Sequence, residues 1–467
     1  MRALAVATLL AVSTLARAAD EVTIPPITRA TIDNGLRVVV AEYHELPLIE
    51  FTLIVGAGAA QDPPGKEGTA ALVAGTLTKG AGKLGADELA RAIESIGGRI
   101  EATPGTDGTI VGAEFLAKDF AAGLDLLRTV LLDPRFARDE VRRGREEQEA
   151  NLVASLEDTS AVAEKCYVGF LYGAQAYGRP VDGRTTTVPK LGRGDVTDFY
   201  ERWYHPNNTV LVLVGDVSAA DAVRRLRDAF GAWRARPDAV PVRTPPPERI
   251  TARRVLLVDK PDATQTQIRF GNVAIARNDP RFIPATVANT ILGGGFTSQL
   301  IEELRIKRSL TYAAWSQFAA RLTGGDFRVG TFTKTPTTTE TLKLALEVEG
   351  AFRTHRPAAA ALEKAKTYLR GQFPLRIESP EALAGRLAEA EFHGLPQDEL
   401  STYRARVAAV TADEVERVAE TLMPSPDTVA IVVVGKAAEI RAPLEAAFGP
   451  VETMSAAECE NLSARKR

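Results

Sequence analysis

The sequence repeats itself once at long range, and this duplication constrains the fold more than any other feature. An apolar segment containing Val38 leads through a second apolar stretch to Asp62, and the same order recurs from Val255 to Asp279. Val38 and Val255 are separated by the same stretch of chain as Asp62 and Asp279. Similarity at so long a period indicates two copies of one domain, because the units of solenoid proteins are several times shorter.

The ends of the two copies also match, and a proline-rich stretch separates them. Val-rich segments close at Gly215 and Gly435, at nearly the same offset, and a Phe-Gly follows each of them. Residues 236–249 contain five prolines, which is typical of an extended linker. A chain of 467 residues also favours two domains, because single cores stop growing at about 250–300 residues. The sequence therefore predicts an N-terminal targeting segment (1–18), a first domain (19–235), a linker (236–249), a second domain (250–450) and a polar tail (451–467).

Strand and helix patterns alternate within each copy, which predicts an α+β fold. Continuous or alternating apolar runs indicate strands, and apolar residues three or four apart indicate helices. The strands predicted in the first copy are 37–41, 50–56, 109–115 and 210–214, and the helices are 87–96, 120–131 and 138–156. We expect two homologous α/β-sandwich-like halves, each a mixed sheet with helices packed on it.

The N-terminal segment, 1–18, has the composition of a signal peptide. Arg2 gives a positive start, residues 3–16 carry no charge and are mainly apolar, and Ala16-Arg17-Ala18 supplies the small residues of a cleavage site. The apolar run is shorter than the roughly 20 residues that a membrane helix needs, and no later segment predicts a span. We expect cleavage after Ala18 and export to the periplasm, with an uncleaved N-terminal helix as the alternative.

Charge and cysteine usage narrow the class of protein further. The 57 Lys and Arg residues nearly balance the 60 Asp and Glu residues, and there are no long basic runs, which argues against nucleic acid as the main partner. The two cysteines, Cys166 and Cys459, lie far apart in the sequence. A disulfide between tail and body is conceivable in an oxidising compartment, but we favour two free or partly buried thiols.

A set of motifs resembles those of the insulinase/pitrilysin family of zinc peptidases. The motifs are Asn34-Gly35-Leu36 before a strand, the stretch 68–80, Trp203-Tyr204-His205-Pro206-Asn207-Asn208, and Gly215-Asp216-Val217. The resemblance covers nearly the whole chain after the signal peptide and is closer to the short bacterial and mitochondrial-processing-peptidase branch. It implies two homologous halves that close as a clamshell around peptide substrates.

The zinc motif of that family is lost in this sequence. Active members carry H-x-x-E-H on a helix, in which the two His bind zinc and the Glu acts as general base. The matching positions are Ala71, Ala74 and Gly75, none of which can bind a metal or accept a proton. The family's third ligand, a Glu, matches Glu149 or Asn151, but one ligand does not make a zinc site. We therefore expect no metal on this chain.

The four histidines do not predict a metal site elsewhere. His44, His205, His355 and His393 are scattered, and no two of them are three or four residues apart. We expect structural hydrogen bonds from His205 and loop or surface positions for the other three. Catalytic zinc normally takes three protein ligands, which these residues do not supply in any local cluster.

The second half retains another feature of the family's active site. Gly293-Gly294-Gly295 precedes a predicted helix that Thr297 or Ser298 could cap, and a strand follows from Tyr312. This string resembles the glycine-rich loop and the arginine–tyrosine pair that hold the substrate backbone in the family, and the pair corresponds to Arg305 and Tyr312. Both side chains can donate to a carbonyl oxygen that becomes an oxyanion. From spacing alone, a solvated Arg and a core Tyr are the alternative.

These features lead to one hypothesis and one alternative. The chain would be the non-catalytic, substrate-binding subunit of an exported heterodimeric zinc peptidase, whose homologous partner carries the zinc. The alternative is a peptide-binding or scaffold protein with the peptidase fold and no hydrolytic role. The resemblance also matches residues 99–102 to the strand that substrates extend in the family, so they form either an auxiliary edge or an ordinary sheet strand.

Overall fold

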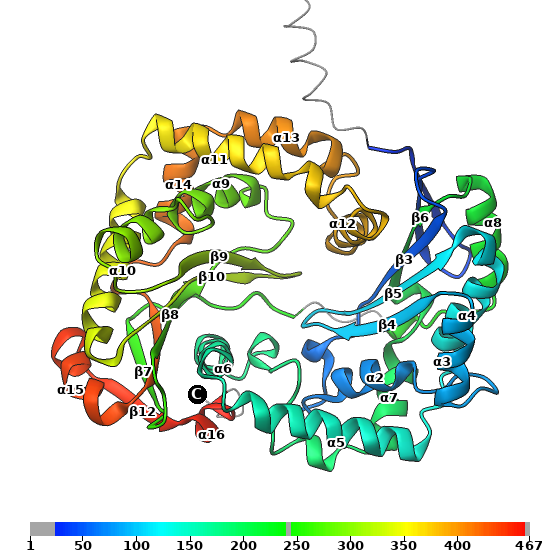
Figure 1. Cartoon of the computed structure of the whole chain (residues 1–467), viewed down its shortest axis with the longest axis horizontal. Helices are drawn as coiled ribbons and strands as arrows, with labels where there is room; N and C mark the ends of the chain where they lie inside the picture. The colour runs from blue at the N-terminus through cyan, green and yellow to red at the C-terminus, as the bar shows by residue number, and fades with distance from the viewer. Residues whose placement is uncertain (1–23, 240–243, 463–467) are drawn as a thin grey trace, which may run out of the picture.

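The two sequence copies form two six-stranded mixed sheets on opposite sides of the molecule (Figure 1). The computed structural model describes residues 24–239 and 244–462, so the predicted signal peptide, four linker residues and the last five residues lie outside the described part. The strand order is β1-β2-β6-β3-β5-β4 in the first sheet and β12-β7-β11-β8-β10-β9 in the second. The predicted α+β architecture of two similar halves is confirmed.

The elements of the first half run from Ile27 to Phe230. Its strands are β1 (Ile27–Thr31), β2 (Arg37–Glu42), β3 (Leu48–Val55), β4 (Arg99–Pro104), β5 (Thr109–Leu116) and β6 (Thr209–Gly215). Its helices are α2 (Thr69–Leu77), α3 (Ala86–Ser95), α4 (Phe120–Leu132), α5 (Arg138–Ser155), α6 (Thr159–Tyr172), α7 (Arg193–Trp203) and α8 (Ala219–Phe230). All the strands and helices predicted in this copy are present.

The elements of the second half follow the same plan. Its strands are β7 (Arg254–Asp259), β8 (Thr266–Val273), β9 (Ala314–Ala320), β10 (Gly325–Thr333), β11 (Ala430–Gly435) and β12 (Val451–Ser455). Its helices are α9 (Phe282–Leu292), η7 (Ile301–Lys307), α10 (Thr338–Thr354), α11 (Ala359–Gln372), α12 (Pro380–His393), α13 (Glu399–Ala409), α14 (Ala412–Leu422), α15 (Ala437–Phe448) and α16 (Ala456–Cys459). Within the described ranges, none of the helices has both the length and the apolar composition needed to cross a membrane.

Each sheet buries its outer face under helices of its own half. Alternate residues of β3, Ile49, Phe51 and Leu53, point into a core that α2–α5, α7 and α8 cover. In β8, Ile268 and Phe270 occupy the corresponding positions under α9–α11 and α13–α15. Because side chains alternate along a strand, the residues between them point to the inner face of each sheet.

Each half covers the inner face of the other half's sheet with one helix. Helix α6 packs on β8 and β11, and α12 packs on β3 and β6 (Figure 1). The two helices start at Thr159 and Pro380, at nearly the same offset as the closing glycines of the two copies, so they are equivalent elements of the repeat. The linker at 236–249 therefore separates the two sheets in the sequence, but each sheet packs against one helix that belongs to the other half.

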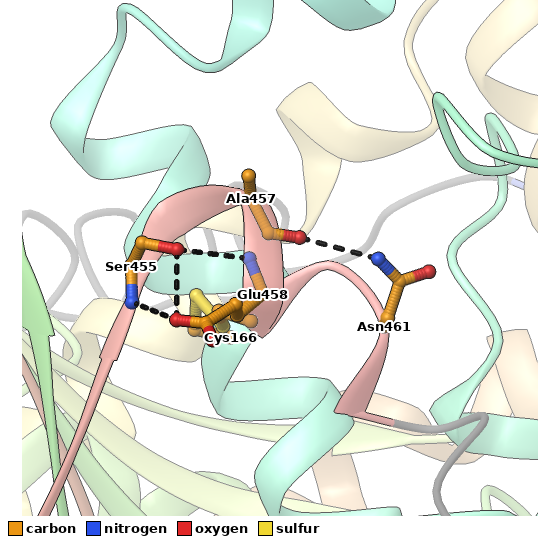
Figure 2. The surroundings of a disulfide bond; sticks show 6 residues. Cys166, Ser455, Ala457, Glu458 and Asn461 are labelled. Atoms are coloured by element: carbon orange, nitrogen blue, oxygen red, sulfur yellow. Dashed lines mark hydrogen bonds between the residues drawn. A yellow bond between two sulfur atoms is a disulfide. The ribbon is translucent and has the colours of Figure 1, made fainter.

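The prediction of two free thiols is wrong. Cys166 in α6 and Cys459 in α16 form a disulfide, with their Cα atoms 5.5 Å apart (Figure 2). No local pattern in the sequence pairs them, because 293 residues separate them. The packing of α16 on α6 brings them together.

The segment predicted as a polar tail is also part of the fold up to Leu462, its last described residue. Val451–Ser455 forms β12, which pairs in parallel with β7 at the edge of the second sheet. Ser455 caps α16, since its Oγ accepts from the N–H of Glu458 at 3.2 Å (Figure 2). Glu460 then accepts a hydrogen bond of 2.6 Å from Thr185 Oγ1 in the first half. The C-terminal segment thus joins the second sheet to the first half.

Candidate functional site

Helix α2 carries the positions that match the lost zinc motif, and a buried carboxylate fixes its start. The two side-chain oxygens of Asp62 accept from the backbone N–H groups of Gly68 at 2.7 Å and Ala70 at 2.8 Å. Burial raises the pKa of Asp62 to about 7, although both hydrogen bonds lower it. These two hydrogen bonds hold the start of α2 in place without any contribution from the zinc-motif positions.

The residues at the motif positions differ in exposure but none carries a donor atom for a metal. Ala71 is half-buried, Ala74 is buried, and Gly75 is exposed with open space where a Cβ would lie. Helix α5 packs beside α2 and carries both residues that match the third ligand, the half-buried Glu149 and the exposed Asn151. At most one ligand is left where catalytic zinc normally takes three, so the residues do not fit a zinc ion.

The histidines are placed mainly as expected, with one exception. His205 has its two ring nitrogens 3.0 and 2.8 Å from backbone carbonyl oxygens, which confirms the predicted structural role. His44 and His355 are exposed. His393 does not lie in a surface loop but ends α12 half-buried, and burial lowers its pKa. Within residues 24–239 and 244–462, no three or more His, Cys, Asp or Glu side chains group as a metal site.

The segment between α9 and β9 holds the glycine-rich loop and takes an uncommon helical form. Residues Ile301–Lys307 form the π-helix η7, and neither Thr297 nor Ser298 caps it through its side chain, contrary to the suggestion from the sequence. Ser309 follows at φ 53°, in the left-handed region that residues with side chains seldom adopt. Gly293 is required by close packing, because a Cβ there would collide with Ser316 of β9. Both π-turns and strained residues concentrate at functional sites.

Arg305 and Tyr312 lie on the solvent-exposed side of this segment. Arg305 is exposed and Tyr312 is 76% exposed, so the alternative of a core tyrosine is wrong. Neither side chain has a hydrogen-bond or ion-pair partner in the described part of the chain. Lys307, by contrast, is paired with Glu303 at 2.7 Å. Both members of the predicted pair are therefore free to contact a ligand.

Two further large apolar side chains are exposed near this pair in the sequence. Phe296, in the loop after the glycines, is 87% exposed, and Ile306 in η7 is 62% exposed. Phe296 also lines an apolar cavity of about 490 Å³ between the loop and α11. The segment from Phe296 to Tyr312 thus exposes both large apolar side chains and hydrogen-bond donors.

Residues 99–102 belong to β4, which is the last strand of its sheet. β4 pairs antiparallel with β5, with Arg99 opposite Glu114 and Ile100 opposite Ala113. Its other side has no strand partner among the described residues. A cavity of about 820 Å³ lies beside it, between the end of α2, α3 and α5. The predicted strand is confirmed, and its role as a substrate edge stays a prediction.

The fold and the lost motif define a chain with a peptidase architecture in which, among the described residues, the zinc motif keeps at most one ligand. Residues 37–181 match the family model described as insulinase (peptidase family M16), and residues 190–369 match the model described as the peptidase M16 inactive domain. The chain therefore belongs to peptidase family M16.

Its relatives in this family carry different names. The chain is similar to an uncharacterized zinc protease of Streptomyces coelicolor, with 27% identity over 403 residues that cover 85% of this chain and 87% of that protein. It is also similar to the non-peptidase homolog YmxG of Helicobacter pylori, with 23% identity over 385 residues that cover 81% and 87%. The crystal structure of a peptidase M16 inactive domain from Pseudomonas fluorescens superposes with a TM-score of 0.83 at 25% identity, covering 88% of this chain and 98% of that one. Family membership alone does not decide between peptidase and non-peptidase, so the residues of the site must.

Proposed function

We propose that this chain is the non-catalytic, substrate-binding subunit of an exported heterodimeric zinc metallopeptidase. The observation that carries the proposal is a contrast between two segments. Helix α2 has lost every donor of the zinc motif at Ala71, Ala74 and Gly75, while Arg305 and Tyr312 are kept, exposed and unpartnered among the described residues. A chain that had lost all connection with peptide hydrolysis would have no reason to keep only the second half of the site.

Arg305 and Tyr312 would act on the peptide carbonyl at the partner's zinc site. The guanidinium and the phenol both donate hydrogen bonds, and the positive charge of Arg305 favours the oxyanion that forms when water adds to the carbonyl. Removing one such donor typically lowers a rate by about 10²–10³. The glycine-rich loop, residues 293–295, would border the bound peptide.

Export is proposed from two independent features. The N-terminal segment up to Ala18 has the composition of a cleaved signal peptide. The Cys166–Cys459 disulfide is the form expected in an oxidising compartment such as the periplasm and is rare in the cytosol. Mass spectrometry of the protein from its native host would test both features, through the N-terminus at Ala19 and the intact disulfide.

The test of the proposed function is reconstitution with a zinc-bearing partner. The candidate partner is a homologous chain with an intact H-x-x-E-H motif, sought first in the neighbouring reading frame. We expect this chain alone to be zinc-free and inert, the partner alone to be weakly active, and the mixture to hydrolyse peptides. If the partner's activity is unchanged by this chain, the divided site is wrong. Zinc-dependent hydrolysis by this chain alone would overturn the proposal and its alternative together.

The alternative is a peptide-binding or scaffold protein without a hydrolytic role. The observation that favours it is the relative in Helicobacter pylori that is named a non-peptidase homolog. Peptide binding by this chain in the absence of a peptidase subunit, combined with no effect on any such subunit, would establish this alternative.

A further inference from the structure

Two buried threonines of β10 carry hydroxyl groups where the pattern of the strand calls for apolar side chains. Alternate residues of β10, Phe327 and Val329, belong to the core of the second half, and Thr331 and Thr333 follow them on the same face. Both threonines are buried, with 1% of each residue exposed. Valine has the same shape and would fill these positions without a polar atom, so each hydroxyl must be accounted for by a hydrogen bond.

Each hydroxyl donates to a backbone carbonyl group close to Tyr312 in the sequence. Thr333 Oγ1 donates to the carbonyl oxygen of Leu310 at 2.7 Å. Thr331 Oγ1 donates to the carbonyl oxygen of Ala313 at 2.9 Å. One acceptor comes before Tyr312 and the other comes after it. The two hydroxyls therefore hold both ends of the short stretch 310–313, which we call the Tyr312 segment.

The backbone ladder between β9 and β10 does not reach the Tyr312 segment. Strand β9 begins at Ala314, and the pair of Ala314 with Thr331 is the last one of the ladder. The Tyr312 segment precedes that pair in the chain and is not part of a strand. Carbonyl groups that lie outside a ladder need other donors, and the two threonine hydroxyls supply them. Strand β10 thus holds the chain beyond the point where its backbone pairing with β9 ends.

A second set of hydrogen bonds joins the Tyr312 segment to η7. The N–H of Leu310 donates to the carbonyl oxygen of Leu304 at 2.9 Å. The N–H of Ser309 donates to the carbonyl oxygen of Arg305 at 3.0 Å. The turn at Ser309 therefore brings the Tyr312 segment back against the end of η7. The threonine hydroxyls then fix the other side of this segment to the sheet.

We infer that Thr331 and Thr333 are positioning residues, which set the place of the Tyr312 hydroxyl at the peptide carbonyl. The Tyr312 side chain has no hydrogen-bond partner in the described part of the chain, so its backbone determines where it lies. A displacement of about 1 Å in a site can lower a rate about 10²-fold. The inference rests on the proposed function, because the threonines act on the same site through Tyr312.

The experiment removes each hydroxyl in the complex reconstituted with the zinc-bearing partner and measures peptide turnover. Thr333→Val keeps the shape of the side chain and loses the donor, so we expect kcat to fall about 10- to 100-fold with little change in KM. Thr333→Ser keeps the donor and should restore most of kcat. Thr331→Val should have a smaller effect, because the carbonyl oxygen of Ala313 also accepts from Thr311 Oγ1 at 2.9 Å.

A matched control and a double substitution separate positioning from packing. Thr109 of β5 is also fully buried, and its hydroxyl donates to the carbonyl oxygen of Ala57 at 2.7 Å. Thr109→Val should therefore cost similar stability and leave kcat unchanged. In the Tyr312→Phe background, Thr333→Val should cause little further loss of kcat, because the donor that it positions is already absent. A further loss as large as that in the wild type would overturn the inference.

The outcomes separate the inference from the proposed function. Loss of kcat in Tyr312→Phe together with full activity in Thr333→Val would overturn the inference and leave the divided site intact. A loss that Thr333→Ser does not restore, or that Thr109→Val reproduces, would overturn it as well, because packing would then explain the effect. Full activity in Tyr312→Phe alone would overturn the inference, and full activity in Arg305→Ala too would overturn the proposed function.

Hydrogen exchange of the lone chain gives a check that does not depend on activity. The amide of Leu310 should exchange faster in Thr333→Val, because the hydroxyl that holds this residue is lost, and at the wild-type rate in Thr109→Val. Equal exchange at Leu310 in the wild type and Thr333→Val would overturn the inference, since the hydroxyl would then not hold the Tyr312 segment.

Discussion

The two halves share one strand plan and differ in what their inner faces hold. In the second half, Arg269 of β8 donates to Ser160 Oγ of α6 at 2.9 Å, and Arg328 of β10 lies between Asp326 and Glu164. In the first half, Glu50 of β3 has no partner among the described residues and faces a cavity. The comparison teaches that the buried charges of one inner face are paired with groups of the covering helix, while the other inner face keeps an unpaired buried acid beside a cavity.

The halves also differ in the element before the edge strand of each sheet. In the first half, the α-helix α3 ends normally, and Gly97 follows at φ 62°. In the second half, the π-helix η7 takes this place, and Ser309 adopts φ 53° without being glycine. The strained version lies in the segment that carries Arg305 and Tyr312. Strained residues are enriched at functional sites, but Phe136 in the core of the first half is also left-handed, at φ 42°, so the strain alone does not assign a function to this segment.

The largest expected effect comes from weakening the contact between α12 and the first sheet. Leu387→Ala removes a fully buried side chain from α12, and we expect it to lower the free energy of unfolding by about 2–5 kcal/mol. Since α12 packs on the first sheet, hydrogen exchange should accelerate in β3 and β6. Leu444→Ala in α15 is the control, with a similar cost but faster exchange in the second half alone. Unchanged hydrogen exchange in β6 of the Leu387→Ala variant would contradict the packing of α12 on the first sheet.

The disulfide distinguishes the edges of the two sheets. Replacing both Cys166 and Cys459 by serine should lower the free energy of unfolding by about 2–5 kcal/mol in chemical denaturation. Exchange should accelerate in β12 and α16, which the disulfide ties down, and not in β1, the edge strand at the same place in the first sheet. Equal stability of the wild type and the double variant would show that the C-terminal segment is held by its other contacts.

Buried Glu50, on the inner face of the first sheet, predicts that the free energy of unfolding depends on pH. The folded protein keeps a proton on Glu50 up to about pH 8, whereas the unfolded chain releases it near its ordinary pKa of 4.5. Stability from this group is therefore present at acidic pH and lost as the pH rises from about 4.5 to about 8, by at most about 1.4 kcal/mol per unit. Glu50→Gln should flatten the measured curve over this range. A slope identical to that of the wild type would mean that Glu50 is already ionised.

The smallest effect concerns Gly97 and Ser309, the left-handed residues that precede the edge strands β4 and β9. Gly97→Ser introduces strain where only a glycine now sits, and should cost about 1 kcal/mol, since a Cβ there meets nothing else. Ser309→Gly relieves the equivalent strain and should leave stability unchanged or raise it by less than about 1 kcal/mol. A clear loss of stability in Ser309→Gly would mean that the serine side chain itself supports the turn.

The sequence predicted the parts of the fold that local patterns determine. The strands around Val38 and Val210 and the helix at 120–131 follow from apolar periodicity, and the repeat indicated the second sheet by analogy. The packing of α6 and α12 on the other half's sheet could not be predicted, because the apolar composition of α6 does not say which sheet it covers. The disulfide was missed for a similar reason, since 293 residues of chain close only through tertiary packing.

In the candidate site, too, local sequence patterns could be predicted and features that depend on tertiary packing could not. Ala71, Ala74 and Gly75 could be identified from a motif whose spacing is local, and so could the string around Arg305. Glu50 was not singled out, although a signal existed: it is the one charged residue in the buried strand Leu48–Val55. A polar residue at an inner-face position becomes informative only when the covering helix is known, and that helix comes from the other half.

The most direct test of the divided site is the turnover of the reconstituted complex with single substitutions in this chain. We expect Arg305→Ala to lower kcat about 10²–10³-fold, with little change in KM and unchanged assembly with the zinc-bearing partner. Arg308→Ala, three residues further along the same exposed segment, is the control and should retain full activity. Equal kcat for the wild type and Arg305→Ala would contradict the account, because the partner would then complete its site without this chain.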